Sequence, residues 1–438
     1  SSCFRHKQRC SGRMGYGTGV LRAHYTVALV RGVTVGVVST SCLFISRRAD
    51  VPQHWLVASR GLGLIFGPTL LARIIGRATW SGESQTGYVL LLTLKALSEL
   101  SIPRANSTLF LLVGFFGVGI VQASLDLWRT LLVTLVHRER CGSALVVYAA
   151  IYGVGSMIAP FMTVANPMQA WDALAAIDFL LAAVLGSKRL YLGKPRDWKL
   201  KIRGVLGSQG PDGDRSNTSS CCQSREGSLP GSPAQKRVPR RVLRAGIVFI
   251  ALSEAAETAM SAWSFTYAAT SLKLPSGTAA MFPTAFYMAF TAMRLALIPL
   301  SRRMAPSAIV QRGALLMLVS AVSFYFLTQR FLTIIQQADA PELVAPGAAW
   351  PLLLCLAFLG TGSCPLYGMM LASVRQHGSL TAQETGWYDT SCNLGITLGL
   401  WLPGWLGLPS FELLFAGMTF CVLSSHMRDF PWWGKVRT

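Results

Sequence analysis

Apolar residues fall in runs of about twenty along most of the chain, separated by short polar segments. A run of this length crosses a bilayer as an α-helix, whereas a membrane β-strand needs about ten residues of alternating polarity, and the runs do not alternate. We therefore expect an all-α, polytopic membrane protein of about twelve transmembrane helices. The expected spans are 25–46, 55–75, 86–103, 108–134, 143–164, 170–190, 242–268, 278–300, 306–328, 347–372, 382–405 and 410–425.

Residues 191–241 interrupt this pattern with a stretch rich in Gly, Ser, Pro and basic residues. A stretch of this composition cannot bury a core, so we predict a disordered cytoplasmic linker. It divides the chain into an N-terminal six-helix bundle (25–190) and a C-terminal six-helix bundle (242–425). Residues 1–24 are expected to form a basic cytoplasmic N-tail, and residues 426–438 a cytoplasmic C-tail.

Composition supports the membrane class. Of the 438 residues, 52% are hydrophobic and 13% are charged, and a soluble domain carries about 25% charged residues. The net charge of +21 does not indicate nucleic-acid binding, because the basic residues lie mostly between the apolar runs, where they orient a membrane protein. With both termini in the cytoplasm, the loops on that side hold more than twice as many Lys and Arg as the other side, even without the linker. In this assignment Arg60 belongs to the outer side.

Polar residues inside the spans are the main functional signal, because a charge in hydrocarbon is retained only where it faces a cavity or a partner. In the seventh span, Glu254 and Glu257 share one helical face with Ser261 and Ser264. We expect this face to line a central cavity, where Glu257 would bind a cation or a solute hydroxyl. Glu254, one turn nearer the cytoplasm, is expected to be gating or structural. The alternative is that these side chains only hold the helices together.

The fourth span carries Gln122, Asp126 and Arg129 on roughly one face. Asp126 and Arg129 are three residues apart, so they can neutralise each other as a structural pair, or a solute or ion can compete for one of them. In the eighth span Arg294 is expected to be structural or gating, because it can snorkel to the nearby cytoplasmic surface. Lys95, Glu99 and Asp178 are expected to be interfacial or paired.

Trp263 and Tyr267 in the seventh span, and Phe286 and Tyr287 in the eighth, are candidates for stacking on a solute ring, although aromatic residues in spans more often pack or anchor the interface. The spans contain no His, and the chain shows no nucleophile–base constellation and no metal cluster. We therefore expect no enzyme and no cofactor, apart from a transported sodium ion or proton.

Five stretches resemble the Major Facilitator Superfamily, and within it the branch of sodium-dependent glucose transporters and fucose-permease-like proteins. They are Trp55–Pro68 (WLVASRGLGLIFGP), Gly117–Val133 with its Leu-Asp pair, Tyr152–Pro160 (YGVGSMIAP), Glu257–Tyr267 (ETAMSAWSFTY) and Ala289–Ser301 (AFTAMRLALIPLS). The resemblance implies two six-helix bundles that rock about a central site. It also implies a transporter of a small polar solute, with a hexose-like sugar favoured and cation coupling an option.

Several positions depart from the pattern of that branch. This chain has Ala72 where the branch has an Asp before the gating residue Arg73, and Met293 where it has a Gly. It also has Thr130 in place of the fourth-helix Asn and Ala149 in place of the fifth-helix His. These changes keep open a non-sugar solute, such as an amino acid or organic anion, and a non-transporting sensor on the same fold. We expect a monomer whose partners are the solute and the lipid bilayer, with the plasma membrane favoured over an organellar one.

Overall fold

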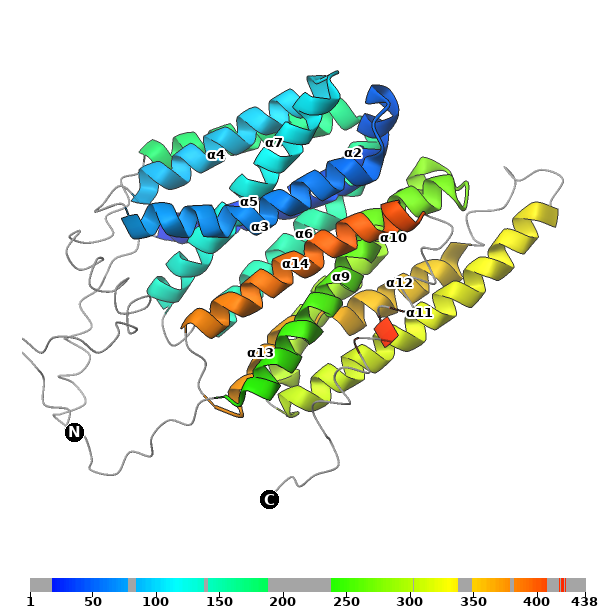
Figure 1. The fold of residues 1–438 in the computed structure, drawn as a ribbon. Helices are drawn as coiled ribbons and strands as arrows, with labels where there is room; N and C mark the ends of the chain where they lie inside the picture. Colours follow the sequence, from blue (N-terminus) through cyan, green and yellow to red (C-terminus); the bar gives the residue numbers. More distant parts are fainter. Residues whose placement is uncertain are drawn as a thin grey trace, which may run out of the picture.

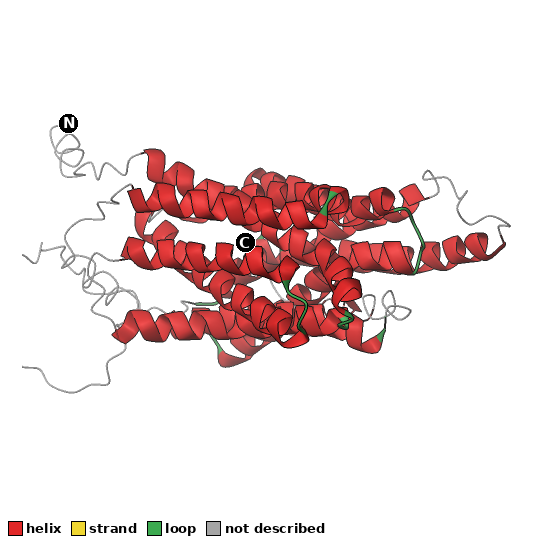
Figure 2. Cartoon of the chain, turned by 90° about the horizontal axis from the view of Figure 1, so that it is seen from above, coloured by secondary structure: helices red, strands yellow, loops and turns green. Residues whose placement is uncertain are grey.

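A computed structural model describes residues 18–77, 84–137, 141–187, 238–301, 303–337, 349–378, 382–407, 417, 419, 420 and 422. Within these ranges the regular structure is helical throughout (Figure 2). The helices are α2 (Thr18–Ala49), α3 (Gln53–Arg77), α4 (Ser84–Ser101), η1 (Ile102–Arg104), α5 (Thr108–His137), α6 (Cys141–Ala165), α7 (Pro167–Ser187), α9 (Arg240–Thr270), α10 (Ser276–Leu300), α11 (Pro306–Gln337), α12 (Trp350–Ser363), α13 (Leu366–Arg375) and α14 (Ala382–Leu406).

These helices confirm the order of the first eleven expected spans and place them within a few residues, except that α2 begins earlier, at Thr18, and α11 ends later, at Gln337. One span also differs in kind. The expected span 347–372 consists of two helices, α12 and α13, which meet at Pro365. Proline removes a backbone donor and disfavours helical geometry in the residue before it, so the helix is interrupted there. Residues 191–237 of the linker and the C-tail lie outside the described residues, as do most of the N-tail and most of the last span, whose few described residues are helical. The last two residues of the expected linker belong to α9, and residues 18–24 of the expected N-tail belong to α2.

The two halves repeat the same helix pairs. In the N-terminal half α2 packs on α6 and α3 packs on α5, and in the C-terminal half α9 packs on α14 and α10 packs on α12. In each half, therefore, the first span packs on the fifth span and the second span packs on the fourth. Such a correspondence is expected of two parallel six-helix repeats.

The halves face each other across a shared interface (Figure 1). It is formed by α3 against α14 and by α6 against α10, with α2 approaching α9. The first, second and fifth spans of each half therefore supply the surfaces between the two bundles. Side chains on these helices are positioned to form a site between the halves.

The outer surface of the bundle is apolar. Leu109 and Val113 on α5 are 71% and 60% exposed, and Phe326 on α11 is 65% exposed. Seven of the described helices are long and apolar enough to cross a membrane by length and composition alone, with α12 and α13 counted as one. Helices α3, α4, α9 and α14 do not meet this criterion, and α3 and α4 bury the charged side chains of Arg60, Lys95 and Glu99 within the bundle. Apolar surface outside and charge inside is the distribution that a lipid environment favours.

Helices α3 and α5 cross closely at two glycines. A Cβ atom placed on Gly119 of α5 would overlap the carbonyl oxygen of Arg60 and lie 3.0 Å from Cα of Gly63 on α3. By contrast, a Cβ atom on Gly117, two residues earlier, would meet nothing within 4 Å. Gly119 therefore sets the distance between the two helices, and Gly117 does not.

We expect Gly119→Ala to destabilise the protein by about 1–3 kcal/mol, because the added methyl group pushes α3 away from α5. The matched control is Gly117→Ala, which adds the same atom to the same helix in open space. Thermal unfolding of the two purified variants in detergent measures the difference. Equal melting temperatures would show that the crossing does not need a glycine at position 119.

Candidate functional site

Arg31 and Asp126 form an ion pair inside the N-terminal half. Arg31 lies in the middle of α2 and its Nη2 contacts Oδ2 of Asp126 on α5. The arginine side chain is 26% exposed and that of Asp126 is 21% exposed, so the pair borders a cavity. The Arg31 guanidinium also lies over the ring of Tyr152 on α6, 5.1 Å from the ring centroid. The pair joins α2, α5 and α6 at one point.

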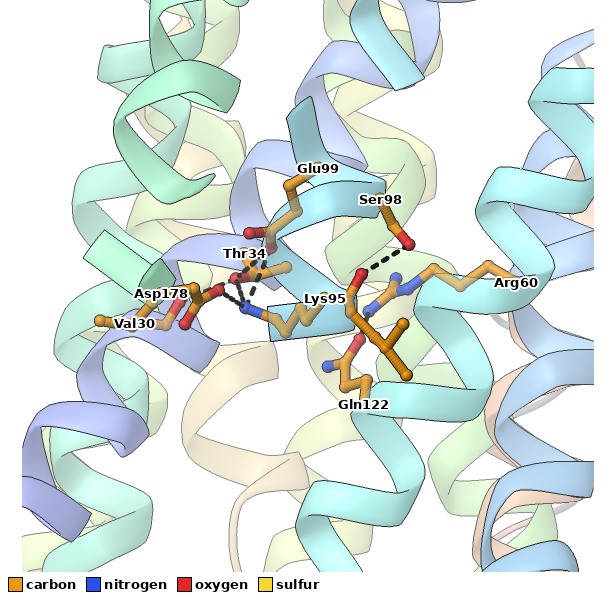
Figure 3. Close-up of polar contacts among 9 residues, drawn as sticks. Val30, Thr34, Arg60, Lys95, Ser98, Glu99, Gln122 and Asp178 are labelled. Carbon is orange, nitrogen blue, oxygen red and sulfur yellow. Dashed lines mark hydrogen bonds and ion pairs between the residues drawn. The ribbon is translucent and has the colours of Figure 1, made fainter. Parts of the chain in front are cut away.

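Arg60 on α3 lies beside this pair and is buried. Its Nη2 donates to Oε1 of Gln122 on α5 at 2.9 Å (Figure 3). The assignment of Arg60 to the outer side of the membrane was therefore wrong. The charge pattern misplaced it because Arg60 lies two turns inside α3, where its long side chain turns into the bundle. Gln122 and Asp126 are one turn apart on the α5 face that sequence analysis selected.

The C-terminal half contributes Glu254 and Glu257 from α9, both partly buried. Arg294 on α10 interacts electrostatically with both carboxylates. Its Nη1 donates to the carbonyl oxygen of Ala149 on α6 at 2.7 Å, and its guanidinium lies 4.2 Å from the centroid of the Phe290 ring. The Arg294 side chain thus reaches across to the N-terminal half instead of extending to the cytoplasmic surface.

Groups from both halves converge on Tyr152. This phenol interacts electrostatically with Arg31 and Arg60 of its own half and with Arg294 and Glu257 of the other half. Tyr287 on α10 interacts with Tyr152 and lies within hydrogen-bonding reach of Ser261 on α9. We define the candidate site by its members from the two halves: Arg31, Arg60, Gln122, Asp126, Tyr152, Glu254, Glu257, Tyr287 and Arg294.

The structure brings together six of the residues selected from the sequence: Gln122, Asp126, Glu254, Glu257, Tyr287 and Arg294. Sequence reasoning missed Arg31, Arg60 and Tyr152 as site members. The sequence could have indicated Arg31, because it is a charged residue within an apolar run. The side chains of Arg129 and Arg73 lie outside the described part of the structure, so their predicted roles stay predictions.

The two aromatic candidates on α9 are placed in helix packing. Trp263 is 2% exposed and its indole N–H donates to the carbonyl oxygen of Leu400 on α14 at 2.9 Å. Tyr267 is 1% exposed, with its ring 6.3 Å from that of Phe324 on α11. These contacts favour the packing alternative, and solute stacking by either ring stays a prediction.

The groups of the site can hydrogen-bond to a small polar molecule, although the cavity that they border in this structure has room for only about one water molecule. It offers guanidinium and phenol donors together with carboxylate and amide acceptors, supplied by both halves of the bundle. Among the described residues, no three His, Cys, Asp or Glu side chains gather to hold a metal ion. A molecule bound here would contact both bundles at once, so a movement of one bundle against the other would change its access to solvent.

Comparison with known proteins agrees with this architecture. The nucleoside transporter NupG has a crystal structure similar to this chain, with a TM-score of 0.64 and 12% identity over 94% of this chain and 99% of that one. The crystal structure of a D-xylose-proton symporter gives a TM-score of 0.66 and 10% identity over 94% and 97%. No curated protein sequence matches the chain significantly. The family model described as Major Facilitator Superfamily matches residues 26–400.

That match covers most of both halves and includes every member of the candidate site. The repeated helix pairs and the site between the bundles are what two parallel repeats would produce. The protein is therefore a multi-pass integral membrane protein that belongs to the Major Facilitator Superfamily of transporters.

Proposed function

We propose that this protein moves a small polar solute, with a hexose-like sugar favoured, across its membrane by alternating access. The observation that carries the proposal is that side chains from opposite halves meet on α6. Arg31 lies over the Tyr152 ring, and Arg294, which interacts electrostatically with Glu257, crosses from the other half to the carbonyl oxygen of Ala149. A solute bound among these groups contacts both bundles, so rocking of the bundles would expose it first to one side and then to the other.

The chemistry of the site supports a hydroxylated solute. Carboxylate and amide oxygens of Asp126, Glu257 and Gln122 can accept hydrogen bonds from hydroxyl groups, and the guanidinium groups can donate to hydroxyl or ring oxygens. The similar structures carry a nucleoside and D-xylose by their names, and both molecules contain a sugar ring. Together with the resemblance of the motifs, this favours a sugar.

A second candidate solute is an organic anion or an amino acid. Buried Arg60 hydrogen-bonds to the neutral amide of Gln122, and within the described residues no carboxylate pairs with it. A buried cation of this kind is balanced most simply by a carboxylate on the solute. This observation favours an anionic or zwitterionic solute, so the test must include both classes.

The test is uptake into proteoliposomes with a panel of radiolabelled hexoses, D-xylose, a nucleoside, amino acids and organic anions. We expect saturable uptake of a hexose that other hexoses inhibit competitively. Uptake of an organic anion or amino acid alone would replace the sugar assignment with the second candidate. No uptake of any member, under imposed sodium or proton gradients or without them, would contradict transport and favour a sensor.

We further propose that Glu257 couples transport to a cation, because its partly buried carboxylate lies between the halves. In Glu257→Gln, we expect the gradient-driven part of uptake to fall to background while exchange of solute across the membrane continues. The matched control is Asp172→Asn, the same chemical change at a carboxylate that is 40% exposed. Unchanged dependence on the ion gradient in Glu257→Gln would remove Glu257 from the coupling step.

A further inference from the structure

Three charged side chains are enclosed within the N-terminal half, outside the candidate site (Figure 3). Lys95 and Glu99 lie one turn apart on α4, and Asp178 comes from α7. Their side chains are 3%, 0% and 1% exposed, respectively. We call these three residues the buried triad.

The hydrogen bonds of the buried triad are unevenly distributed. Lys95 Nζ donates to Oε1 of Glu99 at 2.9 Å, to Oγ1 of Thr34 on α2 at 2.9 Å, and to Oδ2 of Asp178. All three ammonium protons are therefore used. The hydroxyl of Thr34 lies 3.2 Å from Glu99 Oε1 and 3.0 Å from the carbonyl oxygen of Val30, so its single proton is shared between these two acceptors. Both contacts to Glu99 thus fall on Oε1, and its Oε2 is buried with no hydrogen-bond partner in the described part of the structure.

The charges of the buried triad do not balance when all three groups are ionised. One ammonium faces two carboxylates, which leaves a net negative charge with no contact to solvent. An unbalanced buried charge costs several kcal/mol, whereas a neutral hydroxyl without an acceptor costs about 1–3 kcal/mol. Binding one proton is therefore the less costly way to bury the triad.

We propose that the buried triad is a proton-binding site in which Glu99 Oε2 carries the proton. Asp178 keeps its direct ion pair with Lys95, and Glu99 Oε1 continues to accept from Lys95 and Thr34. Oε2 is then the free oxygen on which a proton displaces no existing bond. A metal cation does not suit the same place, because the Lys95 ammonium already occupies the position between the oxygens.

The remaining charged groups near the triad line a small cavity. Its lining includes Lys95 and Asp178 of the triad together with Arg31, Gln122 and Asp126. The cavity has room for about one water molecule. A water molecule there would link Lys95 and Asp178 of the triad to the Arg31–Asp126 pair of the candidate site.

Infrared spectroscopy of the purified full-length protein tests the proposal directly, because the C=O stretch of a protonated carboxyl is separate from that of a carboxylate. At neutral pH we expect Glu99→Gln to lose the band of one protonated carboxyl relative to the wild-type protein. Asp178→Asn is expected to lose the same band although Glu99 is retained. With Asp178 neutralised, an ionised Glu99 alone balances the positive charge of Lys95, so Glu99 no longer needs a proton. Asp172→Asn on the exposed surface is expected to leave the band unchanged.

The two variants remove the proton in different ways: Glu99→Gln replaces the carboxyl that carries it, and Asp178→Asn removes the excess negative charge that requires it. The test therefore stays decisive if one variant does not fold. Loss of the band in a monodisperse Asp178→Asn sample would exclude a purely structural ion pair, which has no proton to lose. Persistence of the full wild-type band in either folded variant would overturn the proposal. None of these measurements depends on which solute the protein carries.

Discussion

Asp126→Asn is expected to reduce solute uptake by about 100-fold while the protein still folds and inserts. The change leaves Arg31 as an unpaired positive charge beside Tyr152, at the centre of the candidate site. Removing one partner of a buried ion pair costs about 3–5 kcal/mol. Because both side chains are partly exposed to the cavity, we expect the lower end of this range, and about 3 kcal/mol in the transport barrier corresponds to roughly 100-fold in rate.

The charge exchange Arg31→Asp with Asp126→Arg is expected to recover part of the lost uptake, since it restores the pair with its orientation reversed. The matched control is the surface pair Arg104 and Asp172, whose side chains are 48% and 40% exposed. An exposed pair contributes at most about 1 kcal/mol, so Asp172→Asn should leave uptake almost unchanged. Similar uptake by Asp126→Asn and the wild-type protein would show that the Arg31–Asp126 pair has no part in the transport cycle.

A disulfide between Gly61→Cys on α3 and Thr397→Cys on α14 is expected to stop uptake. Thr397 Oγ1 donates to the carbonyl oxygen of Gly61 at 2.9 Å, and a Cβ atom on Gly61 would lie 3.1 Å from Cα of Thr397. A disulfide needs Cβ atoms about 3.5–4.5 Å apart, so a small adjustment accommodates it. Because α3 and α14 belong to different halves, the bond would prevent the bundles from separating at this level.

Uptake by oxidised proteoliposomes, before and after addition of dithiothreitol, measures the effect, and the reductant should restore it. The bond can be verified by cutting a protease site inserted into residues 191–241 and observing whether the halves stay joined on a non-reducing gel. Each single-cysteine variant serves as a control for the native thiols, of which Cys42, Cys355 and Cys364 are buried. A fully cross-linked protein that transports at the reduced rate would contradict rocking of the halves at this interface.

The sequence was informative about which helix face carries polar groups. The periodicity of α5 placed Gln122 and Asp126 on one face, and that of α9 placed Glu254 and Glu257 on another, and the structure turns both faces inward. Periodicity has this power because residues three and four apart in a helix always lie on the same side. It relates only residues of the same helix, so it offered Arg129 as the partner of Asp126 and did not identify Arg31.

The partners of the charged residues come from distant parts of the chain. Arg31 pairs with Asp126, Arg60 with Gln122, and Lys95 with Asp178. Each pair depends on which two helices pack together and on how far one is shifted along the other. No local sequence pattern encodes either property. For the same reason the loop-charge rule placed Arg60 on the outer side, since the rule counts residues near span ends and does not register where a side chain turns.

By itself the sequence determined the membrane class, the positions of the spans, the division into two halves and the set of polar residues within them. These properties follow from hydrophobicity and helical spacing, which act over about twenty residues and can be read locally. Only the tertiary structure decided that groups from both halves meet at Tyr152 and that Lys95 lies between two carboxylates in a closed bundle. Charges in a low-dielectric interior must be balanced by neighbours in space, and those neighbours are chosen by the packing of the helices.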